Sequence, residues 1–112
     1  METRINELIS EQNSNYGEKL KQVIFFAHDL LQQEEILPDE LQWQIFINHV
    51  DAMIFRSVTG ETLPEMDEEL FAELSKESIE LALKIMEQVE NLQQNERFLL
   101  ALHIENARGN IN

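Results

Sequence analysis

The chain has 112 residues, and its 43 % hydrophobic content predicts one folded domain with a core of its own. Its formal net charge of −14, with only eight Lys and Arg residues spread along the chain, argues against a nucleic-acid surface, because phosphate binding needs clustered positive charge. There is no cysteine, which excludes disulfides and thiolate metal sites and makes the reducing cytoplasm the expected compartment.

Residues 1–15 are expected to form an N-terminal extension, and residues 16–112 a single helical domain. The N-terminus lacks the basic, hydrophobic leader of a signal peptide, and no apolar run reaches membrane-spanning length, so we expect no membrane partner. Within the extension, residues 2–12 have the spacing of a short helix. Its apolar side carries Ile5, Leu8 and Ile9.

A first long helix is predicted over residues 17–35, where apolar residues recur at helical spacing. These are Leu20, Val23, Ile24, Ala27, Leu30 and Leu31. Pro38 closes the connection and fits the first turn of the next helix, where Asp39 and Glu40 complement the N-terminal dipole.

The segment 41–59 predicts a long helix that organises the rest of the chain, and Gly60 is placed to end it. One predicted buried stripe comprises Trp43, Ile47, Val50, Ile54 and Val58. A second apolar sector comprises Ile45, Phe46, Ala52 and Met53. Through this second sector run His49 and Arg56, seven residues apart, with Arg56 inclined back toward His49. A guanidinium aimed at an imidazole could hold an anion between them.

The remaining segments also predict helices. Residues 61–67 form a linker, and residues 68–75 a short helix with Leu70, Phe71 and Leu74 inward. A longer helix is expected over 76–91, with an apolar stripe of Ile79, Leu81, Ala82, Leu83, Ile85, Met86 and Val89. Asn95 is placed to cap a last helix over 96–108. No segment alternates with period two, so the fold class is all-α, a bundle of five main helices with a possible short extra N-terminal helix.

The last predicted helix repeats the seven-residue spacing that separates His49 from Arg56. His103 follows Glu96 by seven residues, and it lies among Leu99, Leu100 and Ala107. If the two histidine-bearing helices pack antiparallel with His49 opposite His103, Arg56 lies opposite Glu96. The four side chains would then form one polar strip inside an apolar interface, and such a strip needs partners to offset its desolvation.

Two strings, FINHVDAMIFR and NERFLLALHIEN, resemble the two histidine-bearing signatures of the PTS regulation domain, or PRD. The first has a histidine and an arginine seven residues on, and the second has a glutamate seven residues before its histidine. The histidines are 54 residues apart, and the intervening linker, short helix and long helix are similar to the family pattern. The resemblance covers roughly residues 18–108.

The resemblance implies a five-helix bundle with two antiparallel helix pairs, usually a homodimer. It also implies a regulatory role, in which the sugar phosphotransferase system phosphorylates histidines and so changes transcription or a partner protein through the dimer or helix interface. Carried over by position, the phosphoacceptor roles fall on His49 and His103, and phosphate or ion-pair support on Arg56 and Glu96. The donor would be a phosphocarrier protein or an EIIB subunit. With one such domain and no output module, the chain resembles a stand-alone member.

Other classes of function find less support. A di-iron bundle needs Glu three residues before His, where this chain has Phe25, Phe46 and Leu100. No motif of an enzyme is present, so we expect neither catalysis nor a metal or cofactor. His28 has no counterpart in the family pattern and is expected at the edge of the core. The main alternative is a purely structural or protein-interaction helical homodimer that never takes up phosphate.

Overall fold

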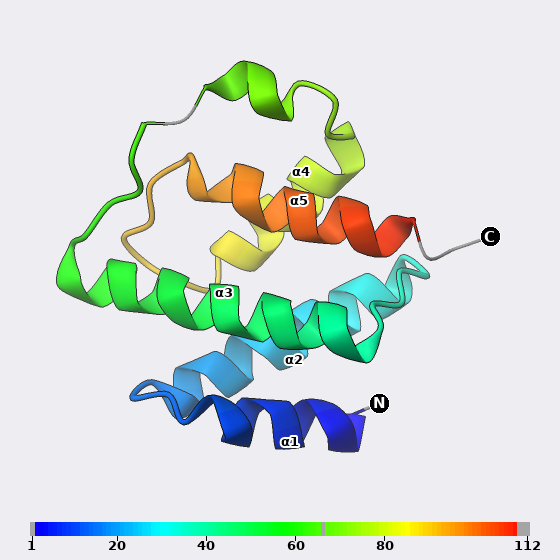
Figure 1. Cartoon of the computed structure of the whole chain (residues 1–112), viewed down its shortest axis with the longest axis vertical. Coiled ribbons are helices and arrows are strands. Elements are labelled where there is room, and N and C mark those ends of the chain that lie inside the picture. The colour runs from blue at the N-terminus through cyan, green and yellow to red at the C-terminus, as the bar shows by residue number, and fades with distance from the viewer. Residues whose placement is uncertain (1, 66, 110–112) are drawn as a thin grey trace.

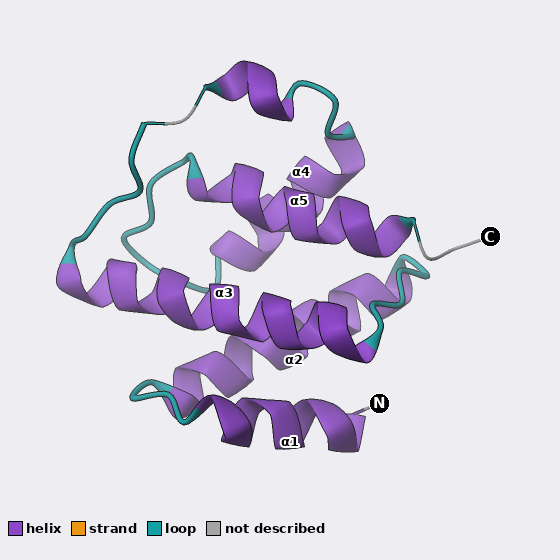
Figure 2. Cartoon of the chain, in the orientation of Figure 1, coloured by secondary structure: helices purple, strands orange, loops and turns teal. Residues whose placement is uncertain are grey.

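The computed structural model describes residues 2–65 and 67–109, and these contain helices but no strand (Figure 2). In chain order the elements are α1 (Glu2–Gln12), α2 (Gly17–Gln33), α3 (Glu40–Thr59), the 3₁₀ helix η1 (Glu68–Phe71), α4 (Lys76–Met86) and α5 (Glu96–Arg108). Consecutive helices α2 and α3 form one antiparallel pair, and α4 and α5 form another (Figure 1). The fold is all-α, as predicted, and antiparallel helix pairs are what the family resemblance implied. Among the described residues, no helix combines the length and the hydropathy that crossing a membrane requires.

Helix α1 lies along α3 and runs in the same direction. At one end Arg4 donates to Glu40 at 2.6 Å, and near the other end Gln12 donates to Asn48 at 3.1 Å. Both bonds join residues 36 positions apart, which is possible only if the two helices are parallel and in register. The predicted apolar side of α1 is buried, with Ile5 fully covered by α2 and α3. Helix α1 therefore contributes side chains to the common core.

The N-terminus of α3 is fixed by a capping box rather than by proline. Asp39 is the N-cap, and its carboxylate accepts from the backbone N–H of Gln42 at 2.8 Å, while the Gln42 side chain accepts from the backbone N–H of Asp39 at 3.0 Å. The prediction that Pro38 occupies the first turn was therefore wrong, because Pro38 precedes the N-cap and lies two residues before Glu40, the first residue of the helix. Gly60 ends the helix as predicted, with φ of 80°, a left-handed conformation that glycine adopts without strain.

Helix α3 buries most of its first predicted stripe. Its main core residues are Trp43, Phe46, Ile47, Val50, Met53 and Ile54. Val58 was expected in the same stripe, but it is 62 % exposed, so the prediction was wrong for this residue. The second sector also divides, since Phe46 and Met53 are buried whereas Ile45 and Ala52 are exposed. As a result α3 keeps an exposed apolar face, which we call the outer α3 face, made of Leu41, Ile45, Ala52 and Phe55.

The region between α3 and α4 is less helical than predicted. The short helix expected over 68–75 is a single 3₁₀ turn, η1, followed by turns. The ring of Phe71 stacks on that of Phe98 of α5, with centroids 5.3 Å apart, and Leu74 packs against the core. The side chain of Leu70 lies outside the described part of the chain. The segment is thus held against the rest of the chain by the Phe71–Phe98 contact and by Leu74, although it is not a continuous helix.

Helix α4 ends at Met86, five residues earlier than predicted. The backbone N–H groups of Gln88 and Val89 bond to carbonyls three residues back, which tightens the chain after the helix. This turn brings Val89, 6 % exposed, back onto the core. The predicted apolar stripe of α4 is buried or partly buried throughout.

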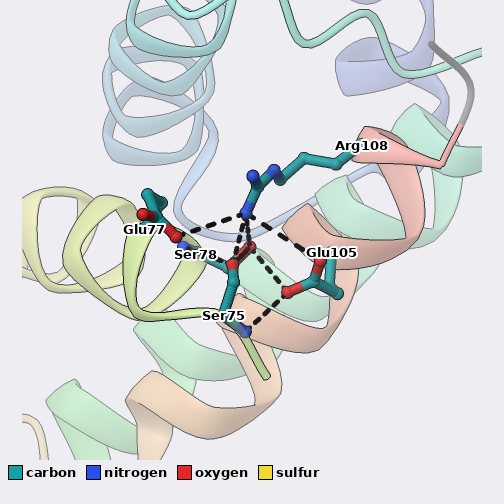
Figure 3. A network of polar contacts seen from close by, with 5 residues as sticks. All are labelled: Ser75, Glu77, Ser78, Glu105 and Arg108. Atoms are coloured by element: carbon teal, nitrogen blue, oxygen red, sulfur yellow. Dashed lines mark hydrogen bonds and ion pairs between the residues drawn. The ribbon is translucent and has the colours of Figure 1, made fainter. Parts of the chain in front are cut away.

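A polar network, which we call the α4–α5 clamp, joins the start of α4 to the end of α5 (Figure 3). The Glu105 carboxylate accepts from the backbone N–H of Ser75 at 2.8 Å and from the fully buried Ser78 hydroxyl at 3.1 Å. Arg108 donates to the hydroxyls of Ser75 and Ser78. These bonds to Glu105 hold its pKa below the usual value. The clamp therefore fixes α4 and α5 as one antiparallel unit, which presents His103 toward α3.

Candidate functional site

The candidate site lies where α3 and α5 face one another. His49 of α3 and His103 of α5 have ring centroids 5.0 Å apart, with the rings tilted by 45°. Phe46, one turn before His49, meets the His103 ring edge-on at 6.0 Å. The antiparallel register expected from the two seven-residue spacings is therefore the register observed.

Arg56 and Glu96 occupy the next position along the same interface. Arg56 donates from Nε to Glu96 Oε2 at 2.7 Å and from a terminal nitrogen to Glu96 Oε1 at 2.8 Å. Glu96 is only 2 % exposed, so this is a buried, two-bonded ion pair. We expected the Arg56 guanidinium to be directed toward an anion beside His49. In the structure it instead donates both of these hydrogen bonds to Glu96. Its charge still acts on His49.

Both histidines are held in the neutral form. Burial is the main reason that the pKa of His49 is lowered to about 4, and the nearby His103 and Arg56 contribute to this lowering. Burial also lowers the pKa of His103. At pH 7 the two imidazoles are therefore uncharged. An uncharged imidazole has a free lone pair on one ring nitrogen and can act as a nucleophile.

The two histidines differ in their surroundings. The Nε2 atom of His49 is buried, and within the described part of the chain it has no hydrogen-bond partner. His103, in contrast, lines a cleft of about 410 Å³ between α3, α5 and the connection from α2 to α3. The described residues that line this cleft are Leu31, Pro38, Gln42, Trp43, Ile45, Phe46, His103, Ile104, Asn106 and Ala107. Nothing in the sequence pattern indicated this cleft, because it depends on how the α2–α3 connection folds over α5.

His28 lies away from this pair, at the edge of the core as expected. Its side chain is 11 % exposed, and its ring lies 5.8 Å from that of Trp43 and 6.4 Å from that of Phe25. Together with Glu2 and Asp29 it brings three potential metal-ligand atoms within 4.8 Å of one another. Both carboxylates are exposed, and such groupings are common on acidic surfaces, so we assign no metal to them.

Asn95 does not cap α5 in the way the sequence predicted. An N-cap side chain needs an extended backbone, but Asn95 already has the right-handed helical conformation, with φ of −69° and ψ of −14°. The helix begins instead through a tight turn in which Glu96, Arg97 and Phe98 donate to carbonyls three residues back. The turn places Glu96 at the first position of α5, directly opposite Arg56.

The fold and the site together define a class of protein. It is an all-helical bundle in which two neutral, facing imidazoles on antiparallel helices lie beside a buried ion pair. In the part of the chain that is described, no phosphate-binding glycine loop or pair of catalytic carboxylates accompanies them. Such a site can accept a group on nitrogen and respond to the added charge.

Comparisons with known proteins identify the family. The model of the PRD domain matches residues 21–107. The solved structure of a PRD-containing transcription regulator from Lactobacillus casei ATCC 334 matches with a TM-score of 0.87 and 30 % sequence identity, over 97 % of this chain and 96 % of that chain. No curated protein matches the chain. This chain therefore belongs to the PRD family, whose domains are regulatory modules of transcription regulators controlled by the sugar phosphotransferase system.

Proposed function

We propose that this chain is a regulatory domain that accepts a phosphoryl group from the sugar phosphotransferase system on His49 and His103. The phosphorylated domain then changes transcription, or the activity of a partner protein, through a change at its helix or dimer interface. The single observation that carries the proposal is the facing of two neutral imidazoles, 5.0 Å apart, beside the buried Arg56–Glu96 pair.

The chemistry requires little from the domain itself. The donor, a phosphocarrier protein or an EIIB subunit, brings a phosphohistidine and hence the free energy of transfer. The acceptor supplies an uncharged ring nitrogen, aligned with the breaking bond. The lowered pKa values of His49 and His103 supply that neutral nitrogen at pH 7. In this proposal the role is regulatory, and no cofactor or metal is required.

The response would come from electrostatics. A phosphoryl group adds about two negative charges at neutral pH. It would compete with Glu96 for Arg56, and a buried carboxylate that loses its cation is strongly destabilising. The α3–α5 interface thus has two arrangements that differ in whether the Arg56–Glu96 pair is kept, and phosphorylation would favour the one in which it is broken.

The proposed partners include a second copy of the chain. The outer α3 face leaves Ile45 47 % and Phe55 41 % exposed, and an apolar helix face of this kind is suited to pairing with another helix. This observation also supports the alternative function, a helical homodimer that acts only as an interaction module. In that alternative the histidines are structural and are never phosphorylated.

Phosphotransfer separates the two functions. The wild-type chain is incubated with phosphoenolpyruvate, the general phosphotransferase enzyme and either the phosphocarrier protein or EIIB, and acid-labile label is measured. We expect label on the wild type and none on the double variant His49→Gln/His103→Gln, while His28→Gln is labelled like the wild type. If the wild type stays unlabelled with both donors, the structural homodimer is the correct function.

A further inference from the structure

The two proposed acceptors are not equally accessible to a donor. The His103 ring forms part of the wall of the 410 Å³ cleft, so a small group entering the cleft meets it directly. The Nε2 atom of His49, in contrast, is buried.

Phosphoryl transfer makes this difference important. The attacking nitrogen, the phosphorus and the leaving atom must lie roughly in line, and the reacting atoms must first come to about 3–3.5 Å. A corridor must therefore lead from solvent to the attacking nitrogen. The cleft provides such a corridor to His103. Nε2 of His49 is buried, so no such corridor reaches it in this structure.

We propose that His103 is the first phosphoacceptor of the pair, and that His49 becomes an acceptor only after the α3–α5 interface has opened. This inference rests on the proposed function, because it assigns an order to the two histidines that the function uses. It gives the pair an order: the histidine that lines the cleft reacts with the donor, and the histidine whose Nε2 atom is buried reacts only when the interface has opened.

The first step is balanced without any further reactant. The lone pair of a ring nitrogen of His103 forms the new N–P bond, and the N–P bond of the donor breaks with its electron pair returning to the donor's nitrogen. The proton lost by His103 is taken up by that leaving nitrogen. The lowered pKa of His103 keeps the attacking lone pair free at neutral pH.

The second step follows from the charge that the first one adds. Phosphohistidine at position 103 places about two negative charges beside the His49 ring, 5.0 Å away, in an interface that contains the buried carboxylate of Glu96. Arg56 is the cation that pairs with Glu96, and it cannot keep both of its hydrogen bonds to Glu96 while neutralising a new anion. Repulsion between the anions then loosens α3 from α5, and His49 becomes accessible.

The test uses phosphoramidate, a small phosphoryl donor, so that no protein donor has to be identified. The wild type, His49→Gln and His103→Gln are incubated at pH 7, and label on each histidine is followed over time by mass spectrometry of peptides. Gln approximates the size of His, so the cleft is not enlarged. His28→Gln serves as a matched control outside the pair.

We expect the wild type to gain label on His103 before His49, and His49→Gln still to gain label on His103. In His103→Gln, labelling of His49 should be slower by about tenfold to thousandfold, since an open state is typically populated at about 0.1–10 %. Labelling of His49 at the wild-type rate in His103→Gln, or labelling of His49 first in the wild type, would overturn the order.

A second measurement needs no substitution. Diethylpyrocarbonate modifies accessible, uncharged imidazoles, and we expect it to modify His103 faster than His49 in the unphosphorylated wild type. Equal rates would contradict the order even if His103→Gln folded poorly. These outcomes are separate from failure of the proposed function, which would appear as an unlabelled wild type with the phosphocarrier protein and EIIB whichever histidine phosphoramidate modifies first.

Discussion

Arg56 donates two hydrogen bonds to Glu96, a carboxylate that is 2 % exposed, and this pair joins α3 to α5 beside the two histidines. We predict that Arg56→Ala lowers the free energy of unfolding by about 3–5 kcal/mol, because it leaves a buried charge without its partner. Urea unfolding followed by circular dichroism measures the change.

The paired substitution Arg56→Met/Glu96→Leu is the control for that prediction. It removes both charges and fills the space with apolar side chains, so it should recover most of the lost stability. A double variant as unstable as Arg56→Ala would mean that the arginine stabilises the fold by packing rather than by neutralising Glu96.

The burial of His49 predicts a dependence of stability on pH. Its pKa is about 4 in the folded chain and 6.5 when the side chain is unperturbed, as in the unfolded chain, so between these values the unfolded chain binds more protons than the folded one. The contribution of neutral, buried His49 to the free energy of unfolding is fully present above pH 6.5, and it is lost as the pH falls toward 4. We expect a loss of up to about 3 kcal/mol. His49→Gln should show a smaller slope between pH 6.5 and 4 in urea unfolding, and an unchanged slope would contradict the assignment.

The α4–α5 clamp predicts a different acid sensitivity. Glu105→Gln should lower the free energy of unfolding by about 1–2 kcal/mol at pH 7, because a charged acceptor of two hydrogen bonds becomes a neutral one. Because folding lowers the pKa of Glu105, the charged carboxylate stabilises the folded chain at pH values above the usual carboxyl pKa. The difference in free energy of unfolding between the wild type and Glu105→Gln should therefore disappear as the pH falls through the pKa of Glu105 in the folded chain. Glu77→Gln is the matched control. Glu77 is exposed, and its carboxylate lies 4.0 Å from Arg108, which is too far for a hydrogen bond. This substitution should change stability little in the same thermal or urea titration.

The proposed homodimer predicts a separation between association and stability. Ile45→Glu, on the outer α3 face, should shift the chain toward monomer in sedimentation velocity without lowering the urea midpoint of the monomer. Val58→Glu is the control on the same helix, since Val58 is 62 % exposed but lies on another side of α3. Equal effects of both substitutions on association would exclude the outer α3 face as the interface.

The sequence predicted which residues of the site face one another, because this depends on helix register. Seven residues make nearly two helical turns, so His49 and Arg56 had to share one line on α3, and Glu96 and His103 another on α5. Antiparallel packing then placed them in pairs. The pattern of apolar residues likewise predicted four of the main helices, because long helices with a strong apolar stripe leave little ambiguity.

What the sequence did not predict depends on contacts between distant segments. The cleft that reaches His103 is lined by residues of α2, α3, α5 and the α2–α3 connection, and no local pattern encodes how these segments come together. The burial of His49 Nε2 is likewise a property of the folded chain. The 3₁₀ turn at η1 is held by the stacking of Phe71 on Phe98, a contact between residues 27 positions apart in the chain.

The position of Trp43 has a practical consequence. It is the single tryptophan of the chain, it is 2 % exposed, and it lines the cleft beside His103. Its ring lies 5.7 Å from that of Phe46, which in turn contacts the His103 ring. Intrinsic fluorescence of the unlabelled chain therefore comes from one indole next to the accessible histidine. A change in emission wavelength or lifetime gives an optical readout of the cleft in real time, with no dye or engineered reporter.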